Sequence, residues 1–404
     1  MTNSSGGINS RLLAALPVVA PPSPPRRYRH GLTPSPSPLR PHCLARDRLH
    51  LWRPASSRAP LDHNGIPLPF SAADIQRIGD VLIHAWSSST TETYGTGLLL
   101  FHVFCDAAGV PEDQRAPTSQ MLLASFIASL AGSYAGQTLS NYVFGIRAWH
   151  ILHGLAWSVN HDEVDALLRA ASAVAPASSK RKKRLPYTPD LIITLRSHLT
   201  LADPLDAAIF ACLTTCFYSA ARVGEFTVRN LQSFDAAVHV RVCDVRVELD
   251  CKGLSETVFF LPRTKMAPSG EDVCWAMQNG LSDPHSAFQN HIAVNAPPTD
   301  GPLFAYRHQK GHRPLTKSAF LQRLAKAARA TKIDPLQGHG IRIGATLEYL
   351  LRGITFDVVK VKGRWAGDSF VLYLRKHAQI LAPYMQAVPA VQEQFLRYTM
   401  PPVR

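Results

Sequence analysis

The sequence lacks the cysteine patterns that define a disulfide scaffold or a zinc module. Its seven cysteines are scattered along the chain, and an odd number without paired spacing argues against a disulfide framework. No group of Cys and His residues has zinc-finger spacing, so no metal site is expected. Cys212 and Cys216 lie four residues apart in an apolar helical stretch, which predicts buried thiols and a reducing compartment.

Long apolar runs and internal repeats are also missing. No uninterrupted apolar stretch reaches the roughly eighteen residues that a membrane-spanning helix needs, so no membrane partner is expected. The chain has 404 residues, of which 46% are hydrophobic. That length exceeds one ordinary core and predicts two domains with flanking segments.

The net charge of +14 is distributed unevenly along the chain. Formal balances are +7 for residues 1–66, −5 for 67–175, +5 for 176–186 and +7 for 187–404. A basic C-terminal half and basic flanking segments suit a polyanionic partner, with nucleic acid as the first choice. The acidic segment 67–175 does not fit that interpretation.

Residues 1–66 are rich in Pro, Ser and Arg. Such a segment buries too little apolar surface to offset its ordering entropy, so we expect a disordered tail. Its acid-poor start also resembles an organellar transit peptide, which leaves the mitochondrion as an alternative location. The density of prolines argues against the amphipathic helix of such a peptide.

Residues 67–175 have the periodicity of a small all-helical domain. Ser71 is suited to cap a first helix that carries Ile75, Ile78 and Leu82 on one face. Further helices are expected at 90–104, 118–132, 136–154 and 161–175.

The segment 176–186 breaks the helical pattern with five consecutive basic residues, Lys180, Arg181, Lys182, Lys183 and Arg184. This linker is predicted to bind DNA by tracking a phosphate backbone, or to act as a nuclear import signal. A solvated linker with neither role is the remaining alternative.

Residues 187–404 predict a second domain of helices with a small antiparallel sheet inserted. Helices are expected from Thr188, at 203–219, at 316–331 and onward to the end. Strands are expected over 238–247, 256–261 and 273–277, with Lys265 in the loop between the last two. The fold class is therefore mainly α, with an all-helical domain before a mixed α+β domain.

Charged residues of this second domain are candidates for phosphate chemistry. Arg222 is suited to present its planar fork to phosphate oxygens, with Glu225 holding it in place, although a plain surface ion pair is the alternative. Lys265 is either a solvated loop lysine or a proton donor to a leaving oxygen.

A second group of candidates lies near the C-terminus. His339 and Arg342 lie three residues apart at the expected start of a helix, where anions are favoured. Trp365 has an indole donor that could bond a phosphate oxygen or simply pack. Tyr373, usually a core or surface aromatic, follows as a possible nucleophile.

The order and spacing of these residues resemble the tyrosine recombinase (phage-integrase-like) family over residues 70–400. The matching elements are Arg222 with Glu225, Arg263-Thr264-Lys265, His339-x-x-Arg342, Trp365 and Tyr373. The helical region 67–175 is similar to the family's core-binding domain, which clamps DNA. The stretch Gly363-Arg364-Trp365 with Phe370-x-x-Tyr373-x-Arg375 is most similar to recombinases of fungal Crypton-type and DIRS-type mobile elements.

The resemblance implies a DNA strand-exchange enzyme that needs neither metal nor nucleotide cofactor. Tyr373 would attack the scissile phosphate to give a 3′-phosphotyrosyl link, with Lys265 protonating the departing 5′-oxygen. Arg222 and Arg342 would clamp non-bridging oxygens, with His339 and Trp365 adding hydrogen bonds. Arg263 and the basic linker would contact DNA.

One spacing departs from the family pattern, because Tyr373 follows Trp365 by eight residues where phage and bacterial members usually have nine. Mobile-element versions tend to be shorter here, which keeps Tyr373 as the expected nucleophile. Tyr349, inside the helix of His339, and Tyr384, after a proline, are poorer candidates.

The resemblance also implies partners and a location. Double-stranded DNA and a homotetramer on DNA are expected, in the nucleus, with the segment 391–400 docking either on a neighbouring subunit or on its own domain. Three alternatives remain: a catalytically inactive, domesticated DNA-binding protein, a type IB topoisomerase, and a helical interaction scaffold.

Overall fold

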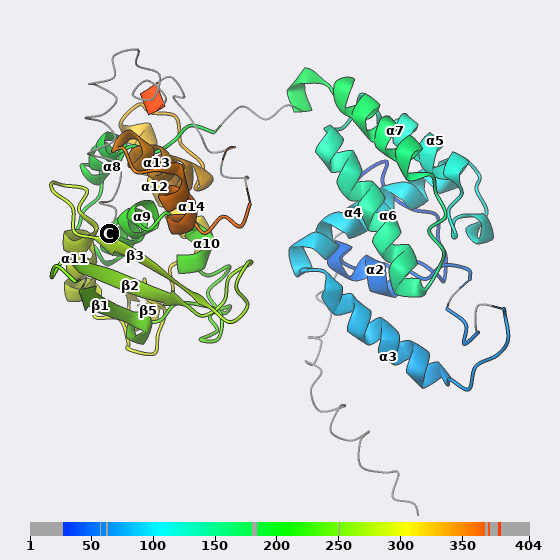
Figure 1. The fold of residues 1–404 in the computed structure, drawn as a ribbon, viewed down its shortest axis with the longest axis horizontal. Coiled ribbons are helices and arrows are strands. Elements are labelled where there is room, and N and C mark those ends of the chain that lie inside the picture. The colour runs from blue at the N-terminus through cyan, green and yellow to red at the C-terminus, as the bar shows by residue number, and fades with distance from the viewer. Residues whose placement is uncertain are drawn as a thin grey trace, which may run out of the picture. The chain divides into compact units, whose positions relative to one another are not determined.

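The computed structural model describes residues 27–56, 58–61, 64–179, 184–249, 251–367, 371 and 379–380. The chain forms two compact units, the N-terminal unit Met1–Lys182 and the C-terminal unit Lys183–Arg404 (Figure 1). The described part of the first is helical, and the second combines helices with small antiparallel sheets, which confirms the expected fold class. No described helix is long and apolar enough to cross a membrane.

The helices of the N-terminal unit mostly begin where the sequence provides a capping side chain. Ser71 and Asp74 form a capping box at the start of α3, which confirms the predicted cap. Asn160 accepts two backbone N–H groups at the start of α7. The helices are α2 (Arg48–Leu51), α3 (Ala72–Leu82), α4 (Ser88–Ala107), α5 (Gln120–Leu130), α6 (Gly136–His153) and α7 (His161–Ala173).

The segment before these helices is packed rather than disordered. Trp52 is completely buried in the same hydrophobic core as Phe101 of α4 and Trp149 of α6. The indole N–H of Trp149 donates to the Trp52 carbonyl oxygen at 2.7 Å. The expectation of a disordered tail over 1–66 is therefore wrong for its described part, because one tryptophan and a few leucines bury enough apolar surface to order the surrounding prolines.

Arginines fix this segment to α4. The guanidinium of Arg48 donates to the Gly95 carbonyl oxygen at 3.0 Å. A side chain at Gly95 would place its Cβ 1.8 Å from the Ala45 carbonyl oxygen, so the close approach requires glycine. The basic segment 27–56 and the acidic helices thus belong to one folded unit.

A buried ion network uses some of the acidic residues that the charge count had left unexplained. Arg40 and Arg115 both pair with Asp106, at 3.3 and 2.8 Å, and Arg40 also contacts Glu112 at 2.5 Å. Burial, with the charges of Arg40 and Arg115 beside it, holds the pKa of His102 well below its ordinary value. These two carboxylates are therefore neutralised by arginines of the same unit.

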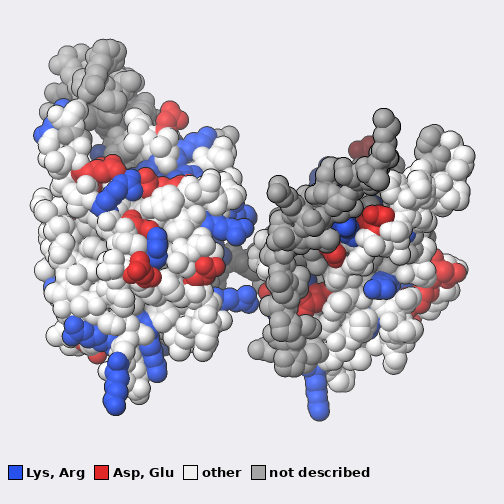
Figure 2. All heavy atoms as spheres, turned by 90° about the horizontal axis from the view of Figure 1, so that it is seen from below, with Lys and Arg blue, Asp and Glu red and all other residues white. Residues whose placement is uncertain are grey.

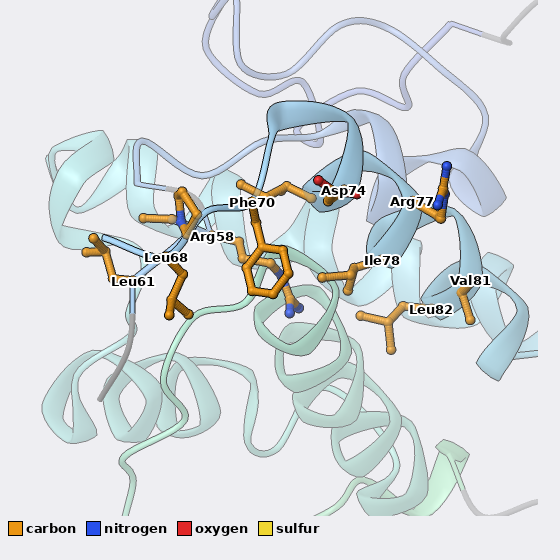
Figure 3. Close-up of a pocket in the computed structure, with 12 residues that line it drawn as sticks. Arg58, Leu61, Leu68, Phe70, Asp74, Arg77, Ile78, Val81 and Leu82 are labelled. Atoms are coloured by element: carbon orange, nitrogen blue, oxygen red, sulfur yellow. The ribbon is translucent and has the colours of Figure 1, made fainter. Parts of the chain in front are cut away.

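Helix α3 has no buried residue, so the apolar face predicted for it is not enclosed by the core. Ile78, Val81 and Leu82 instead line a groove of about 620 Å³ together with Leu68 and Phe70 of the preceding loop (Figure 3). The groove lies within the N-terminal unit and contains none of the predicted site residues.

The C-terminal unit has seven described helices and two small sheets. The helices are α8 (Pro189–Arg196), α9 (Pro204–Tyr218), α10 (Val223–Phe226), α11 (Pro284–Asn295), α12 (Lys317–Ala330), α13 (His339–Leu351) and α14 (Phe356–Lys362). The strands are β1 (Val245–Leu249), β2 (Ser255–Leu261), β3 (Glu271–Ala276), β4 (Tyr306–His308) and β5 (Gly311–Arg313). Helix α11 and the β4–β5 hairpin were not predicted.

Helix α9 is the centre of this unit. Every residue from Asp206 to Tyr218 is buried, which is typical of a helix surrounded by other elements on all sides. Its contacts include α11, α13, α10 and β3. Cys212 and Cys216 are both fully buried, with their sulfur atoms 4.0 Å apart, which confirms the expected buried thiols.

The three-stranded sheet is antiparallel in the order β1-β2-β3 and lies below α12, α13 and α14 in the view of Figure 1. Phe259 of β2 pairs with Val273 of β3, and both face the core. The β2–β3 hairpin carries Lys265 in its loop, as predicted. The strand expected from 238 begins only at Val245, because residues 242–244 form a 3-10 turn closed by Arg241 and Asp244.

Packing of the N-terminal segment has a measurable consequence. We expect Trp52→Ala to lower the free energy of unfolding of the N-terminal unit by about 3–5 kcal/mol, the usual cost of truncating a buried aromatic. Calorimetry of the full chain measures this. The control is Phe70→Ala, since Phe70 is 56% exposed and should cost about 0.5 kcal/mol or less. Equal small effects would show that the segment is not part of the core.

Candidate active site

Arg222 is positioned by the turn that ends the central helix. Ala220 adopts a left-handed φ of 51°, and its neighbour Ala221 donates back to the Cys216 carbonyl oxygen at 3.0 Å. This turn makes Arg222 the N-cap of α10. Glu225 accepts both the Arg222 backbone N–H and its guanidinium, each at 2.8 Å, so the predicted contact between them is present.

Glu225 is shared by two arginines. Its second partner is Arg364, whose guanidinium donates to it at 2.6 Å. Burial by itself would raise the pKa of the Glu225 carboxyl, but Arg364 and Arg222 outweigh burial and hold that pKa below its ordinary value. Glu225 is therefore a carboxylate over the neutral pH range and a fixed acceptor for Arg222.

His339 is the first residue of α13, as the sequence predicted. The helix packs closely on the chain that follows the basic linker, where Tyr187 donates its N–H to the Gly340 carbonyl oxygen at 3.0 Å. A side chain at Gly344 would place its Cβ 2.0 Å from the Tyr187 carbonyl oxygen. This close approach holds Arg184, which donates to Gln337 at 2.8 Å, beside the start of α13.

Positive charge surrounds His339. Burial first, and then the charges of Arg184, Arg342, Arg222 and Lys317, lower the pKa of His339 to about 4. These five residues, which we call the His339 cluster, come from four separate parts of the C-terminal unit. The imidazole is neutral at pH 7, and the cluster is a concentration of cationic charge at a helix N-terminus, where an anion is favoured.

Arg342 and Trp365 lie against each other. The Arg342 guanidinium carbon is 4.3 Å from the centre of the Trp365 ring, and the guanidinium donates to the Gly363 carbonyl oxygen. Arg342 is 1% exposed and Trp365 is 8% exposed. Trp365 packs on Arg342 and fixes it, and its predicted bond to a phosphate oxygen stays a prediction.

Gly363 is required by this stacking. A Cβ at Gly363 would lie 1.5 Å from an atom of the Trp365 ring. The position therefore excludes any side chain while Trp365 keeps its place over Arg342.

Lys265 and Arg263 are exposed in the loop of the β2–β3 hairpin. The residue between them, Thr264, is buried and shapes the tip. Its hydroxyl donates to Glu271 at 2.6 Å and accepts the backbone N–H of Ala267 at 3.1 Å. The loop around Lys265 thus has a defined conformation, and the catalytic role of Lys265 stays a prediction.

Sequence reasoning missed three residues of the site. Lys317 belongs to the His339 cluster, Glu271 holds Thr264, and Arg364 joins Glu225 to Glu271. The only signal in the sequence for Arg364 was its place between Gly363 and Trp365. Nothing in the sequence indicated that Lys317 would lie near His339.

Several predicted residues lie outside the part of the chain that the structure describes. They are the nucleophile candidates Tyr373 and Tyr384, the linker residues Lys180, Arg181, Lys182 and Lys183, and the segment 391–400. Tyr349 is described and has a structural role, because its buried hydroxyl donates to the Tyr218 carbonyl oxygen at 2.6 Å.

The wider surface carries charge of both signs. On the face shown in Figure 2, Lys and Arg side chains are interspersed with Asp and Glu on both units. Among the described residues, no three His, Cys, Asp or Glu side chains are grouped so that they could hold a metal ion. The His339 cluster gathers cationic charge at the start of α13, and it is suited to bind a phosphate or similar anion.

No protein-family model and no curated protein matches this sequence. Among solved structures, the chain is similar to the XerH site-specific recombinase bound to palindromic difH substrate. Sequence identity is 12%, the TM-score is 0.49, and the match covers 78% of this chain and 84% of that one.

Two further structures are similar at comparable levels. The Tn1549 transposon integrase in complex with circular intermediate DNA has 12% identity, a TM-score of 0.45 and coverage of 77% and 99%. A lambda integrase dimer bound to a COC′ core site has 12% identity, a TM-score of 0.43 and coverage of 76% and 77%. These structural neighbours are recombinases and integrases, and the chemistry of this chain has to be argued from its own residues.

The His339 cluster predicts a response to anions. We expect inorganic sulfate, compared with chloride at equal ionic strength, to raise the pKa of His339 from about 4 by about one unit, because a nearby anion favours imidazolium. Histidine NMR of the full chain, assigned with His339→Gln, measures this. His291 is the control, since burial lowers its pKa to about 4 with no arginine among the charges that shift it; a matching shift there would mean a nonspecific salt effect.

Stacking at Gly363 generates a second prediction. We expect Gly363→Ala to lower the free energy of unfolding by about 1–3 kcal/mol, because the added methyl group overpacks the site. Trp365 would move off Arg342, which tryptophan fluorescence of the variant should report. The matched control is Gly367→Ala, whose Cβ would have no atom within 4 Å. Equal stability of the two variants would contradict the stacking.

Proposed function

We propose that this protein is a DNA breaking-and-rejoining enzyme, a site-specific tyrosine recombinase. The observation that carries the proposal is the His339 cluster, in which the charges of Arg222 and Arg342, 120 residues apart in the sequence, both act on His339. A phosphodiester is the anion that two arginines and a helix N-terminus suit best. The order of the motif residues along the chain supports the same function independently.

In the proposed reaction the Tyr373 oxygen attacks the scissile phosphorus. The bond from phosphorus to the 5′-oxygen breaks, and Lys265 gives that oxygen a proton while the phenol proton leaves to solvent. The phosphotyrosyl link keeps the energy of the broken bond, so a 5′-hydroxyl of the second duplex can reverse the step. Arg222, Arg342 and the His339 imidazole stabilise negative charge that develops on the non-bridging oxygens.

The state of His339 suits this role. A pKa of about 4 keeps the free imidazole neutral, so it can donate one hydrogen bond without adding charge to an already cationic site. When DNA brings its phosphate, the pKa of His339 rises, because the anion offsets the surrounding arginines. Neutral His339 in the free protein therefore lowers the repulsion among the cations of the empty site.

The subfamily, the location and the assembly on DNA that we propose rest on the sequence. The Gly363-Arg364-Trp365 motif with Tyr373 eight residues after the tryptophan supports a recombinase of Crypton-type or DIRS-type mobile-element origin. The basic linker supports a nuclear location. We also propose that residues 67–175 clamp DNA as a core-binding domain and that four protomers act together on two duplexes.

A second candidate function is a DNA-binding protein that no longer cuts. It is favoured by the burial of Arg342, which is 1% exposed and is held by Gly363 and Trp365. In that case the cluster would bind a phosphate through its exposed cations alone. The two functions differ in whether a covalent adduct forms.

Trapping the covalent intermediate tests the function. We expect the full chain to form an adduct on a random-sequence library of nicked duplexes, which denaturing gels detect and sequencing maps. Tyr373→Phe should abolish the adduct. Arg222→Ala and Arg342→Ala should each slow its formation by about 10²–10³-fold, the usual cost of removing a donor that stabilises developing charge.

Tyr349→Phe is the matched control, since the Tyr349 hydroxyl serves the core and the variant should still react. An adduct that survives Tyr373→Phe but not Tyr384→Phe would move the nucleophile to Tyr384. DNA binding without any adduct would favour the second candidate, and relaxation of supercoils at no specific site would indicate a topoisomerase.

A further inference from the structure

Arg364 has an unusual backbone conformation for its residue type. Its φ is 57°, in the left-handed region, which costs a residue with a Cβ about 1–2 kcal/mol. The residue lies between Gly363 and Trp365, and its side chain is 10% exposed. Local strain of this kind persists only where the surrounding contacts compensate for it.

Two carboxylates supply that compensation. The Arg364 guanidinium donates to Glu271 and to Glu225, both at 2.6 Å. The side chains of Glu225 and Glu271 are 9% and 21% exposed. Short, charge-assisted bonds between partly buried groups are among the stronger hydrogen bonds in proteins. The left-handed turn is therefore held by the ion pairs that its side chain makes.

Each carboxylate in turn holds a different part of the site. Glu225 accepts the backbone N–H and the guanidinium of Arg222. Glu271 accepts the hydroxyl of Thr264, whose oxygen accepts the N–H of Ala267 across the tip of the hairpin. Lys265 follows Thr264 directly in that tip.

We propose that Arg364 is a positioning residue that couples three catalytic elements. Its guanidinium joins the start of α10, which carries Arg222, to the hairpin tip, which carries Lys265. Its backbone sets the turn in which Trp365 lies over Arg342. Lysine is a poor replacement, because its N–H donors are all on one nitrogen, whereas the planar fork of arginine reaches the two carboxylates from two separate nitrogens. The inference rests on the proposed recombinase function for its catalytic meaning.

The alternative is an ion pair that only stabilises the fold. Arg246 offers a matched comparison in the same unit, because it also bridges two carboxylates, Glu248 at 2.6 Å and Asp272 at 2.7 Å. Arg246 lies on the exposed strand β1 and contacts none of the site residues named above. A positioning role predicts effects at Arg364 that the loss of Arg246 does not produce.

The first measurement does not depend on activity. Arg364→Gly removes the side chain and tolerates the left-handed φ, and Glu271→Gln removes one charge. We expect both variants of the full chain to raise hydrogen exchange in the tip 263–270 by about tenfold, the factor that corresponds to one lost charge-assisted bond. Arg246→Ala should leave this exchange unchanged. Unchanged exchange in Arg364→Gly would overturn the coupling.

The second measurement uses two DNA substrates on which the wild type forms adduct, one with the ordinary 5′-oxygen leaving group and one with sulfur in its place. A thiolate leaves without a proton, so the sulfur substrate does not need Lys265. We expect Arg364→Gly to slow adduct formation about tenfold to a hundredfold on oxygen and by a smaller factor on sulfur, where only the displacement of Arg222 and Arg342 still acts. Lys265→Ala should slow the reaction on oxygen alone. Arg246→Ala should react normally on both.

The outcomes separate the inference from the function. Equal slowing of Arg364→Gly on both substrates would overturn its role in positioning Lys265, because general destabilisation ignores the leaving group. Absence of any adduct with the wild type would count against the recombinase itself. In that case the exchange measurement would still decide whether Arg364 couples α10 to the hairpin.

Discussion

The site of the C-terminal unit depends on the ion pairs that the Glu225 carboxylate makes with Arg222 and Arg364. Arg222 reaches it from the end of the buried helix α9, and Arg364 reaches it from a turn 139 residues later in the sequence. Both bonds are short, and burial makes their loss expensive. Because Arg364 also binds Glu271, one chain of charge-assisted bonds links the end of the central helix, the β2–β3 hairpin and the turn that contains Arg364.

Charge is used differently in the two units. In the N-terminal unit, Arg40 and Arg115 neutralise Asp106 and Glu112 inside the fold, so formal charge there says little about partners. In the C-terminal unit, burial and the charges of four cationic residues lower the pKa of the His339 imidazole. Converging like charges cost folding free energy, and such a cost is typical of a site that binds an opposite charge. The positions of the charged side chains in the fold therefore indicate a binding partner better than the net charge of the chain does.

Local patterns predicted most elements well. The caps at Ser71 and Thr188, the start of α13 at His339 and the hairpin around Lys265 all follow from short-range rules of hydrogen bonding and alternation. Composition led to a wrong prediction of disorder for residues 27–56. The proline and arginine content does not show that Trp52 packs into the core of the N-terminal unit. The predicted apolar face of α3 is present, but periodicity could not show that it lines a groove, because a core face has the same pattern.

The sequence alone determined which residue types could act on a phosphate and in what order they follow, because motif spacing is fixed by the covalent chain. It also placed Glu225 within reach of Arg222, and the structure forms that contact as a capping box at the start of α10. Only the tertiary structure decided that Arg184 and Lys317 join His339, that Trp365 stacks on Arg342, and that Arg364 bridges Glu225 and Glu271. These contacts join distant segments, and their geometry depends on how the whole core packs around α9.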